Sequence, residues 1–161
     1  MVWSYSGDRG GNSGRDDLHM INKFDGPNKF LSNFFPVWIE YEGIKYPSVE
    51  HAYQACKTND PKVKEKIATC GHPSIAKRMG NNLYKEKWAL IKYDVMLELV
   101  RLKFKDESLK HKLLMTNSEI LIEGNDWGDV YWGISRGVGQ NNLGKILMTV
   151  RSECRPFKAP F

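Results

Sequence analysis

The sequence predicts a mixed fold in which helices predominate over a few short strands. Apolar residues recur every three or four positions along residues 84–105, as they do on the buried face of a helix. Two helix starts are marked, one by Ser48 and one by Asp60 followed by Pro61. Residues 42–43, Glu-Gly, lie between two strand-like segments and are typical of a hairpin turn.

Length and composition indicate one globular domain of 161 residues, with 41% hydrophobic and 27% charged residues. No apolar run approaches a membrane span and the N-terminus lacks a signal-peptide core, so we expect no membrane association. The three cysteines, at positions 56, 70 and 154, form no close pair. This argues against disulfides or a zinc site and favours a reducing cytoplasm. The net charge of +5 suits an anionic ligand such as a phosphate, or solubility alone.

Residues 1–19 are rich in glycine and lack a lasting apolar period. We therefore expect a flexible arm or long loop ahead of a domain over residues 20–161. Within the arm, residues 2–5 are compatible with a short strand or a tail. The first strand of the domain is expected at residues 20–24, followed by a turn at residues 25–29.

Asn33 lies between two pairs of large apolar residues in the segment 30–36. An amide in that setting is expected to be partly buried, where it needs hydrogen-bond partners. Asn33 is therefore either a ligand contact or a loop residue that satisfies its own backbone. The hairpin strands, residues 37–41 and 44–46, follow and lead the chain to the helix after Ser48.

The helix after Ser48 places Glu50, Gln54 and Lys57 on one line beside its apolar face. A solvated helix would scatter its charges, whereas this one gathers a carboxylate, an amide and an ammonium at the edge of the core. Glu50 stands in the first turn, where the helix dipole favours the ionised carboxylate. The plainer interpretation is an ordinary amphipathic helix with a polar pair one turn apart.

The middle of the chain predicts more helices, of which the second is expected to end at Gly80. Trp88 lies near the start of the longest expected helix and is either a core residue or a ring that stacks on a base or sugar. The expected helices cover residues 60–71, 73–79, 84–105 and 108–116, and a strand is expected at residues 120–123.

The segment 123–144 is rich in glycine, acids and aromatic residues and shows little periodicity. A long irregular loop costs ordering entropy, so such a loop in a compact domain is usually functional. Asn141 or Asn142 is expected to cap a last helix over residues 145–153, whose first N–H groups suit a phosphate. Arg151 is expected at the surface.

Two long stretches of the chain resemble the NADAR superfamily. The first is Phe30-Leu31-Ser32-Asn33-Phe34-Phe35-Pro36, followed by Tyr46-Pro47-Ser48-Val49-Glu50-His51-Ala52-Tyr53-Gln54-Ala55-Cys56-Lys57. The second is Asp129-Val130-Tyr131-Trp132-Gly133, followed by Gly139-Gln140-Asn141-Asn142-Leu143-Gly144 and Leu147-Met148-Thr149-Val150-Arg151. The resemblance runs from about Ile21 to Arg151 in the family's order and spacing, and Tyr131 is a conservative departure where phenylalanine is as frequent.

The resemblance implies a compact, mostly helical α+β domain with a small sheet and a pocket for a phosphate-bearing ribosyl group. It also implies hydrolysis of a C–N glycosidic bond. The substrate is then either a ribosylaminopyrimidine 5′-phosphate of riboflavin synthesis or ADP-ribose attached to a guanine in nucleic acid. By matching positions, Glu50 is the central acid, and the pocket contains Asn33, Lys57, Trp88, Asp129 and Trp132.

Cleavage of such a bond develops positive charge at the anomeric carbon, which a carboxylate stabilises, and the leaving nitrogen needs a proton. We expect Glu50 to activate water or stabilise the ribosyl cation, and Asp129 to hold the ribose hydroxyls or the leaving base. In a second route, Lys57 forms a Schiff base with the opened ribose aldehyde. Both routes stay open from the sequence. The residues expected to contact substrate are Asn33, Phe34, Gln54, Trp88, Trp132, Gly133 and Asn141.

Water is the only co-substrate that either route needs, and no residue spacing matches a metal site, so we expect no cofactor. The expected partner is the small phosphorylated riboside or the ADP-ribosylated nucleic acid, without a membrane or an obligate protein partner. A non-catalytic module that binds ADP-ribose or NAD is the alternative, although intact Glu50, Lys57 and Asp129 favour the enzyme. A non-specific nucleic-acid binder ranks last, because the lysines of residues 62–66 and 103–112 are mixed with acids.

Overall fold

The computed structural model describes residues 3–4 and 19–156, so the arm predicted over residues 1–19 lies almost entirely outside the described residues. Within it, Trp3–Ser4 form the short strand β1, which agrees with the strand alternative. The described residues gather into two compact units. Residues up to Ser32 together with those from Lys110 onward form the first unit, and Asn33–Leu109 form the second.

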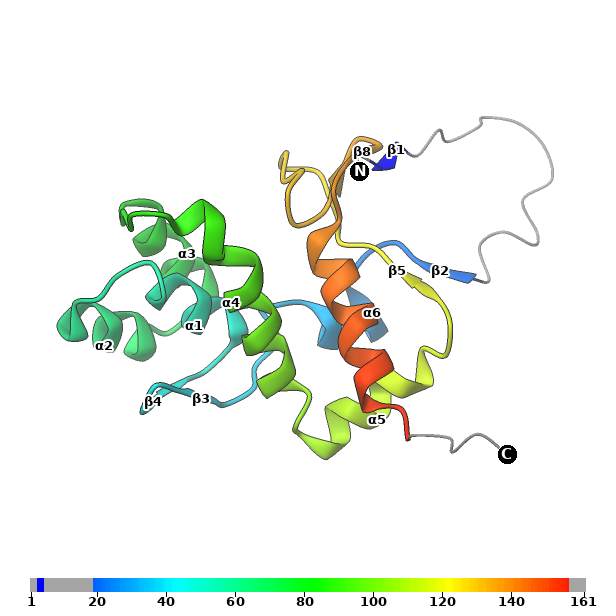
Figure 1. Ribbon diagram of the computed structural model, residues 1–161, viewed down its shortest axis with the longest axis horizontal. Coiled ribbons are helices and arrows are strands. Elements are labelled where there is room, and N and C mark those ends of the chain that lie inside the picture. Colours follow the sequence, from blue (N-terminus) through cyan, green and yellow to red (C-terminus); the bar gives the residue numbers. More distant parts are fainter. Residues whose placement is uncertain (1–2, 5–18, 157–161) are drawn as a thin grey trace. The chain divides into compact units, whose positions relative to one another are not determined.

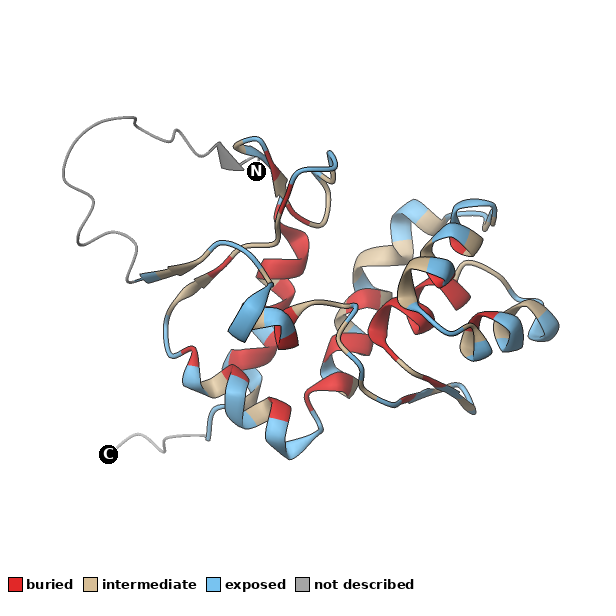
Figure 2. Ribbon diagram, turned by 180° about the vertical axis from the view of Figure 1, so that it is seen from behind, coloured by how far each residue is buried: buried red, intermediate tan, exposed pale blue. Residues whose placement is uncertain are grey.

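The second unit is a cluster of helices around a short central one (Figure 1). The central helix, α1, packs against the three other helices of the unit, and all of its residues are buried (Figure 2). The elements of this unit are β3 (Ile39–Tyr41), β4 (Ile44–Tyr46), α1 (Val49–Ala55), α2 (Pro61–Thr69), α3 (Pro73–Asn81) and α4 (Trp88–Lys103).

The predicted hairpin is confirmed, with Ile39 opposite Tyr46 and Tyr41 opposite Ile44 in an antiparallel pair. Its turn residues, Glu42 and Gly43, both have positive φ angles, of 50° and 82°. Two consecutive residues with positive φ angles form the two-residue hairpin turn whose twist matches that of the flanking strands. The hairpin therefore fixes where the chain enters α1.

Both predicted helix starts are confirmed. The Ser48 hydroxyl accepts a hydrogen bond from the backbone N–H of His51 at 3.2 Å, which satisfies one of the free donors at the start of α1. In α2, Oδ1 of Asp60 accepts from the backbone N–H of Lys62 at 2.9 Å, and Pro61 occupies the first helical position.

The prediction that Gly80 ends its helix is wrong, because α3 continues through Gly80 to Asn81. Glycine is needed at this position for helix packing and does not mark the end of the helix. A Cβ at position 80 would lie 1.7 Å from Oε1 of Gln54, so the residue is glycine where the Gln54 side chain of α1 lies against α3.

The first unit contains short strands and one long helix. Four strands form a sheet in the order β1-β8-β7-β6, and β2 pairs in parallel with β5. The region expected as an irregular loop thus contains short strands, and the turn expected at residues 25–29 is part of a 3₁₀ helix, Gly26–Leu31. The other elements are β2 (Met20–Ile21), β5 (Ile120–Leu121), β6 (Gly124–Asn125), β7 (Ile134–Ser135), β8 (Val138–Gly139) and α6 (Asn142–Cys154). The helix α5 (Glu107–Met115) runs across the sequence boundary between the units.

The core of the first unit lies between α6 and β5, which pack against each other. The expectation of a surface position for Arg151 is wrong, because Arg151 is 6% exposed. Its Nη1 donates to the hydroxyl of Thr116 at 2.9 Å and to the backbone carbonyl of Glu119 at 2.8 Å. These partners explain how a guanidinium is accommodated in the interior.

Helices and short strands together confirm the predicted α+β class. None of the helices in the described part of the chain is long and apolar enough to cross a membrane.

Candidate active site

Glu50 and Gln54 form a buried polar pair on α1. Their side chains are 7% and 3% exposed, and Nε2 of Gln54 donates to Oε1 of Glu50 at 2.8 Å. Burial removes the carboxylate from water, so the hydrogen bond replaces part of its hydration. The predicted alignment of Glu50 and Gln54 is therefore confirmed, although both side chains are buried inside the core rather than placed at its edge, and their hydrogen bond orients the carboxylate.

The backbone of Asn33 holds the first turn of α1. Its carbonyl accepts a hydrogen bond from the backbone N–H of Glu50 at 3.1 Å, one of the helix-start donors that has no partner within the helix. The side-chain Nδ2 lies 3.5 Å from the sulfur of Met96 on α4. Asn33 is thus adjacent to Glu50 in the fold, as its assignment to the site requires.

Lys57 lies just beyond the end of α1, next to the aromatic ring of Tyr53. Its Nζ is 5.3 Å from the centroid of the Tyr53 ring, and the Tyr53 and Trp88 rings are 5.3 Å apart, inclined at 50°. Burial lowers the pKa of the Lys57 amine, an effect that the Glu50 carboxylate partly opposes. The uncharged, nucleophilic form of Lys57 is therefore easier to reach than that of a lysine in water.

Phe34 is one of the six predicted site residues that lie in this unit, and its side chain is 37% exposed. Its ring meets the His72 ring edge to face, with centroids 6.3 Å apart. The unit therefore presents an exposed aromatic edge at a residue assigned to substrate contact. Its other predicted site residues are Asn33, Glu50, Gln54, Lys57 and Trp88.

His51, beside Glu50 in sequence, is used for structure. It is 2% exposed, with Nδ1 2.7 Å from the Ser48 hydroxyl and Nε2 3.1 Å from the backbone carbonyl of Cys70. A carbonyl only accepts, so Nε2 carries the proton and Nδ1 accepts from the hydroxyl. Burial lowers the pKa of His51, in keeping with this neutral form.

In the first unit, Asp129 organises its own loop. Its Oδ1 accepts from the backbone N–H groups of Tyr131 at 3.2 Å and Trp132 at 2.9 Å. The Asn125 side chain adds two hydrogen bonds to the backbone of Asp129, one to its N–H and one to its carbonyl, at 3.0 and 2.8 Å. One oxygen of the predicted second acid is therefore engaged in shaping the loop that carries Trp132.

The expectation that the start of α6 offers free N–H groups to a phosphate is wrong for its first two residues. The N–H of Asn142 donates to the carbonyl of Tyr131 and that of Leu143 to the carbonyl of Trp132, at 3.2 and 3.0 Å. The loop therefore takes the donors that a phosphate would use.

Asn141 precedes α6 but does not cap it with its side chain. Its Oδ1 accepts from the N–H of Glu123 at 3.0 Å, and its Nδ2 donates to the carbonyl of Leu121 at 3.0 Å. Gly133 is also explained by packing, since a Cβ there would lie 2.1 Å from the carbonyl oxygen of Glu123. Both residues shape the loop, and their contact with substrate stays a prediction.

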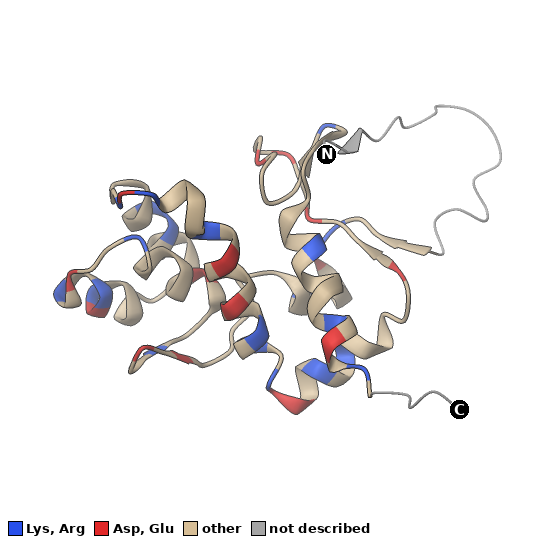
Figure 3. Ribbon diagram, in the orientation of Figure 1, with Lys and Arg blue, Asp and Glu red and all other residues tan. Residues whose placement is uncertain are grey.

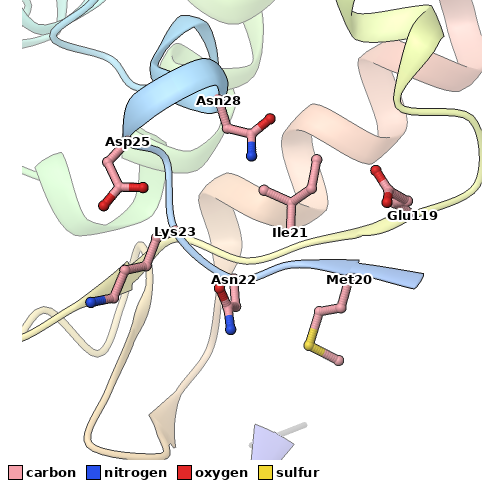
Figure 4. A pocket seen from close by; sticks show the side chains of 7 residues that line it. All are labelled: Met20, Ile21, Asn22, Lys23, Asp25, Asn28 and Glu119. Atoms are coloured by element: carbon pink, nitrogen blue, oxygen red, sulfur yellow. The ribbon is translucent and has the colours of Figure 1, made fainter. Parts of the chain in front are cut away.

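A cavity of about 430 Å³ opens elsewhere on the first unit (Figure 4). It contains none of the predicted site residues. Its lining is polar, with Lys23, Asp25, Asn28 and Glu119 around the strand β2. In the part of the chain that the structure describes, no cluster of three His, Cys, Asp or Glu side chains is arranged to hold a metal ion.

The charge distribution agrees with a low rank for non-specific nucleic-acid binding. On α2, lysines and a glutamate share one helix (Figure 3). Exposed runs of a single sign are what retain a polyanion without regard to sequence.

Tyr53 is a buried residue of α1 that is not among the residues expected to form the site. The structure gives it a second role, because its ring joins Trp88 to Lys57. The available signal was the spacing of Tyr53 and Lys57, which are four residues apart and therefore neighbours on a helical surface.

The helical unit, with its buried carboxylate and amide and its half-buried lysine, defines a small α+β protein with the groups needed for acid–base or nucleophilic chemistry. A family model of the NADAR domain matches residues 20–155, and the chain belongs to this family.

Two relatives and one solved structure show what the chain is similar to. It is 34% identical over 127 residues to the N-glycosidase YbiA of Shigella boydii, covering 76% of this chain and 79% of that protein. It is 38% identical over 129 residues to a riboflavin biosynthesis protein of Vibrio vulnificus, covering 77% of this chain but only 35% of that longer protein. The NMR structure of Escherichia coli YbiA superposes with a TM-score of 0.75 at 33% identity, covering 83% of each chain.

Proposed function

We propose that this protein hydrolyses the C–N bond between a phosphorylated ribose and a base, with Glu50 as the central carboxylate. Its family and its relatives of matched length make the chain an N-glycosidase. One observation carries the assignment to Glu50: this carboxylate is buried, oriented by Gln54, and close enough to Lys57 to influence the pKa of its amine.

In the first route, Glu50 acts on water or on the developing ribosyl cation. As the bond to nitrogen lengthens, positive charge builds up at the anomeric carbon and the ring oxygen. A carboxylate that is already desolvated and oriented stabilises this charge without reorganising at the moment of reaction. Gln54 supports the role because its hydrogen bond to Oε1 fixes how the Glu50 carboxylate is turned.

In the second route, Lys57 is the nucleophile. Its Nζ attacks C1 of the ring-opened ribosylamine, the base leaves with a proton as its free amine, and an iminium links Lys57 to C1. Water then adds to the iminium and releases the sugar aldehyde and the lysine. The burial that lowers the pKa of Lys57 supports this route.

The remaining site residues have proposed binding roles. Trp88, braced by Tyr53, offers a face for a base or sugar. Asp129 has one oxygen committed to its loop, so a contact with ribose hydroxyls or the leaving base would use its Oδ2. The others proposed to contact substrate are Asn33, Phe34, Gln54, Trp132, Gly133 and Asn141.

A ribosylaminopyrimidine 5′-phosphate is the first substrate to test, because a relative is named for riboflavin biosynthesis. ADP-ribose on guanine in nucleic acid presents the same bond and is the second. We place the reaction in the cytoplasm, since none of the three cysteines forms a disulfide, as in a reducing compartment.

A release assay on both substrates, run side by side, tests the proposal. Free base is followed by mass spectrometry for the unaltered protein and for Glu50→Gln. We expect release from at least one substrate by the unaltered protein, and loss of release in the variant. Tight binding of both substrates without release would instead make the chain a binding module.

A further inference from the structure

Gly80 lies in the interior of α3, where glycine is costly. Its backbone is helical, so no unusual φ angle requires glycine. Glycine inside a helix is less stable than alanine by about 0.5–1 kcal/mol. What the position does require is an absent side chain, because a Cβ would lie 1.7 Å from Oε1 and 2.6 Å from Cδ of Gln54.

The carboxamide of Gln54 is held between Gly80 and Glu50. Its Nε2 donates to Glu50, whereas its Oε1 is buried without a hydrogen-bond partner among the described residues. A buried acceptor without a partner is unfavourable. The orientation of Gln54 is therefore set by its hydrogen bond to Glu50 and by the space over Gly80. It is not set by a hydrogen bond to its own Oε1.

From this geometry we infer that Gly80 is a positioning residue for the Glu50 carboxylate, acting through Gln54. The inference rests on the proposed role of Glu50. The two closest atoms to a methyl group at position 80 belong to the far end of the flexible Gln54 side chain, so the fold accommodates the methyl by turning the carboxamide away, with a small shift at Cβ of Gln54, 3.0 Å off. That movement removes the hydrogen bond that orients Glu50.

A double-mutant cycle separates this role from simple helix packing. We expect Gly80→Ala and Gln54→Ala each to lower kcat about tenfold with little change in KM. A tenfold change corresponds to about 1.4 kcal/mol, which is the scale of one hydrogen bond to a charged group. In the Gln54→Ala background the two closest atoms are gone and only Cβ of Gln54 remains, 3.0 Å from the new methyl, so adding Gly80→Ala should cost little further. Gly71→Ala is the matched control, since a Cβ at position 71 meets nothing within 4 Å.

A readout independent of catalysis is the side-chain amide resonance of Gln54 in a ¹⁵N-labelled sample. It should move in Gly80→Ala and stay in place in Gly71→Ala. An unmoved resonance, or an equal loss of kcat from Gly80→Ala in both backgrounds, would overturn the inference.

These experiments also separate the positioning role of Gly80 from the proposed function of Glu50. If Glu50→Gln were fully active, the proposed function of Glu50 would fail, and the resonance alone would decide whether Gly80 positions the pair. If Gly80→Ala did not fold, a folded Gln54→Ala/Gly80→Ala protein would support the inference, and an unfolded one would overturn it.

Discussion

The amine of Lys57 lies over the ring of Tyr53, 5.3 Å from the ring centroid. The two residues are four positions apart in the sequence. The contact keeps the lysine beside an apolar surface, and burial lowers the pKa of its amine. A lysine in this setting is suited to form an iminium with an aldehyde.

Borohydride trapping therefore has a definite expected outcome at Lys57. With substrate and borohydride together, we expect a stable ribityl-type adduct on the peptide containing Lys57, detected by mass spectrometry. Lys57→Arg keeps a positive charge but cannot form the iminium, so it should show no adduct. An unmodified Lys57 in an actively turning-over sample would favour the water route.

Glu50→Gln should separate chemistry from binding. The carboxamide keeps the size of the side chain and an oxygen that accepts from Gln54, so we expect unchanged thermal stability and ligand affinity. Turnover should fall by a factor on the order of 10²–10⁴, the range associated with a lost acid–base group. Base release by mass spectrometry and calorimetric titration with the substrate give the two values. Retention of full activity would remove Glu50 from its assigned role.

The stability of the protein should fall between neutral and mildly acidic pH because of His51. Burial holds its folded-state pKa below its unfolded value, so the stabilisation is complete above the unfolded pKa of about 6.5. It is lost as pH falls from there through the folded pKa, at no more than about 1.4 kcal/mol per pH unit for one group.

The measurement is urea unfolding of the unaltered protein and His51→Asn at several values between pH 7.5 and pH 5. The pH dependence should flatten in the variant. His111→Asn alters an exposed histidine and should leave the slope unchanged. Parallel curves for the unaltered protein and His51→Asn would show that the decline has another source.

Arg151 contributes to stability from inside the first unit. Arg151→Met keeps much of the side-chain bulk but leaves the Thr116 hydroxyl and the Glu119 carbonyl without their donor. We expect a loss of about 1.5–3 kcal/mol in the free energy of unfolding, the usual scale for hydrogen bonds to a charged group. Arg155→Met, at an exposed position, should cost about 0.5 kcal/mol or less in the same urea titration.

The elements that the sequence predicts well depend on neighbouring residues. The turn at Glu42 and Gly43 and the caps at Ser48 and Asp60 act within a few positions, so their residue types alone indicate them. The alignment of Glu50 and Gln54 follows from helical spacing in the same way.

The errors occur where a distant segment decides the outcome. Gly80 has the signature of a helix end, but Gln54, from another helix, accounts for the glycine. Arg151 has the signature of a surface charge, but Thr116, 35 residues earlier, accepts from it in the interior. Asn141 has the signature of a cap, yet its side chain bonds to Leu121 and Glu123. No local pattern reports such partners, so these positions follow from tertiary structure alone.

The start of α6 is tied to the loop before it, because Tyr131 and Trp132 supply the carbonyls for its first two N–H groups. Most helix ends fray and exchange their amide protons quickly. Here Asn142 and Leu143 should exchange slowly and at matching rates, because releasing them requires the aromatic loop to detach as well. Heating should consequently open the loop between β6 and β7, which carries Trp132, together with the first turn of α6 as one cooperative unit. We expect no intermediate in which the helix alone begins to unwind.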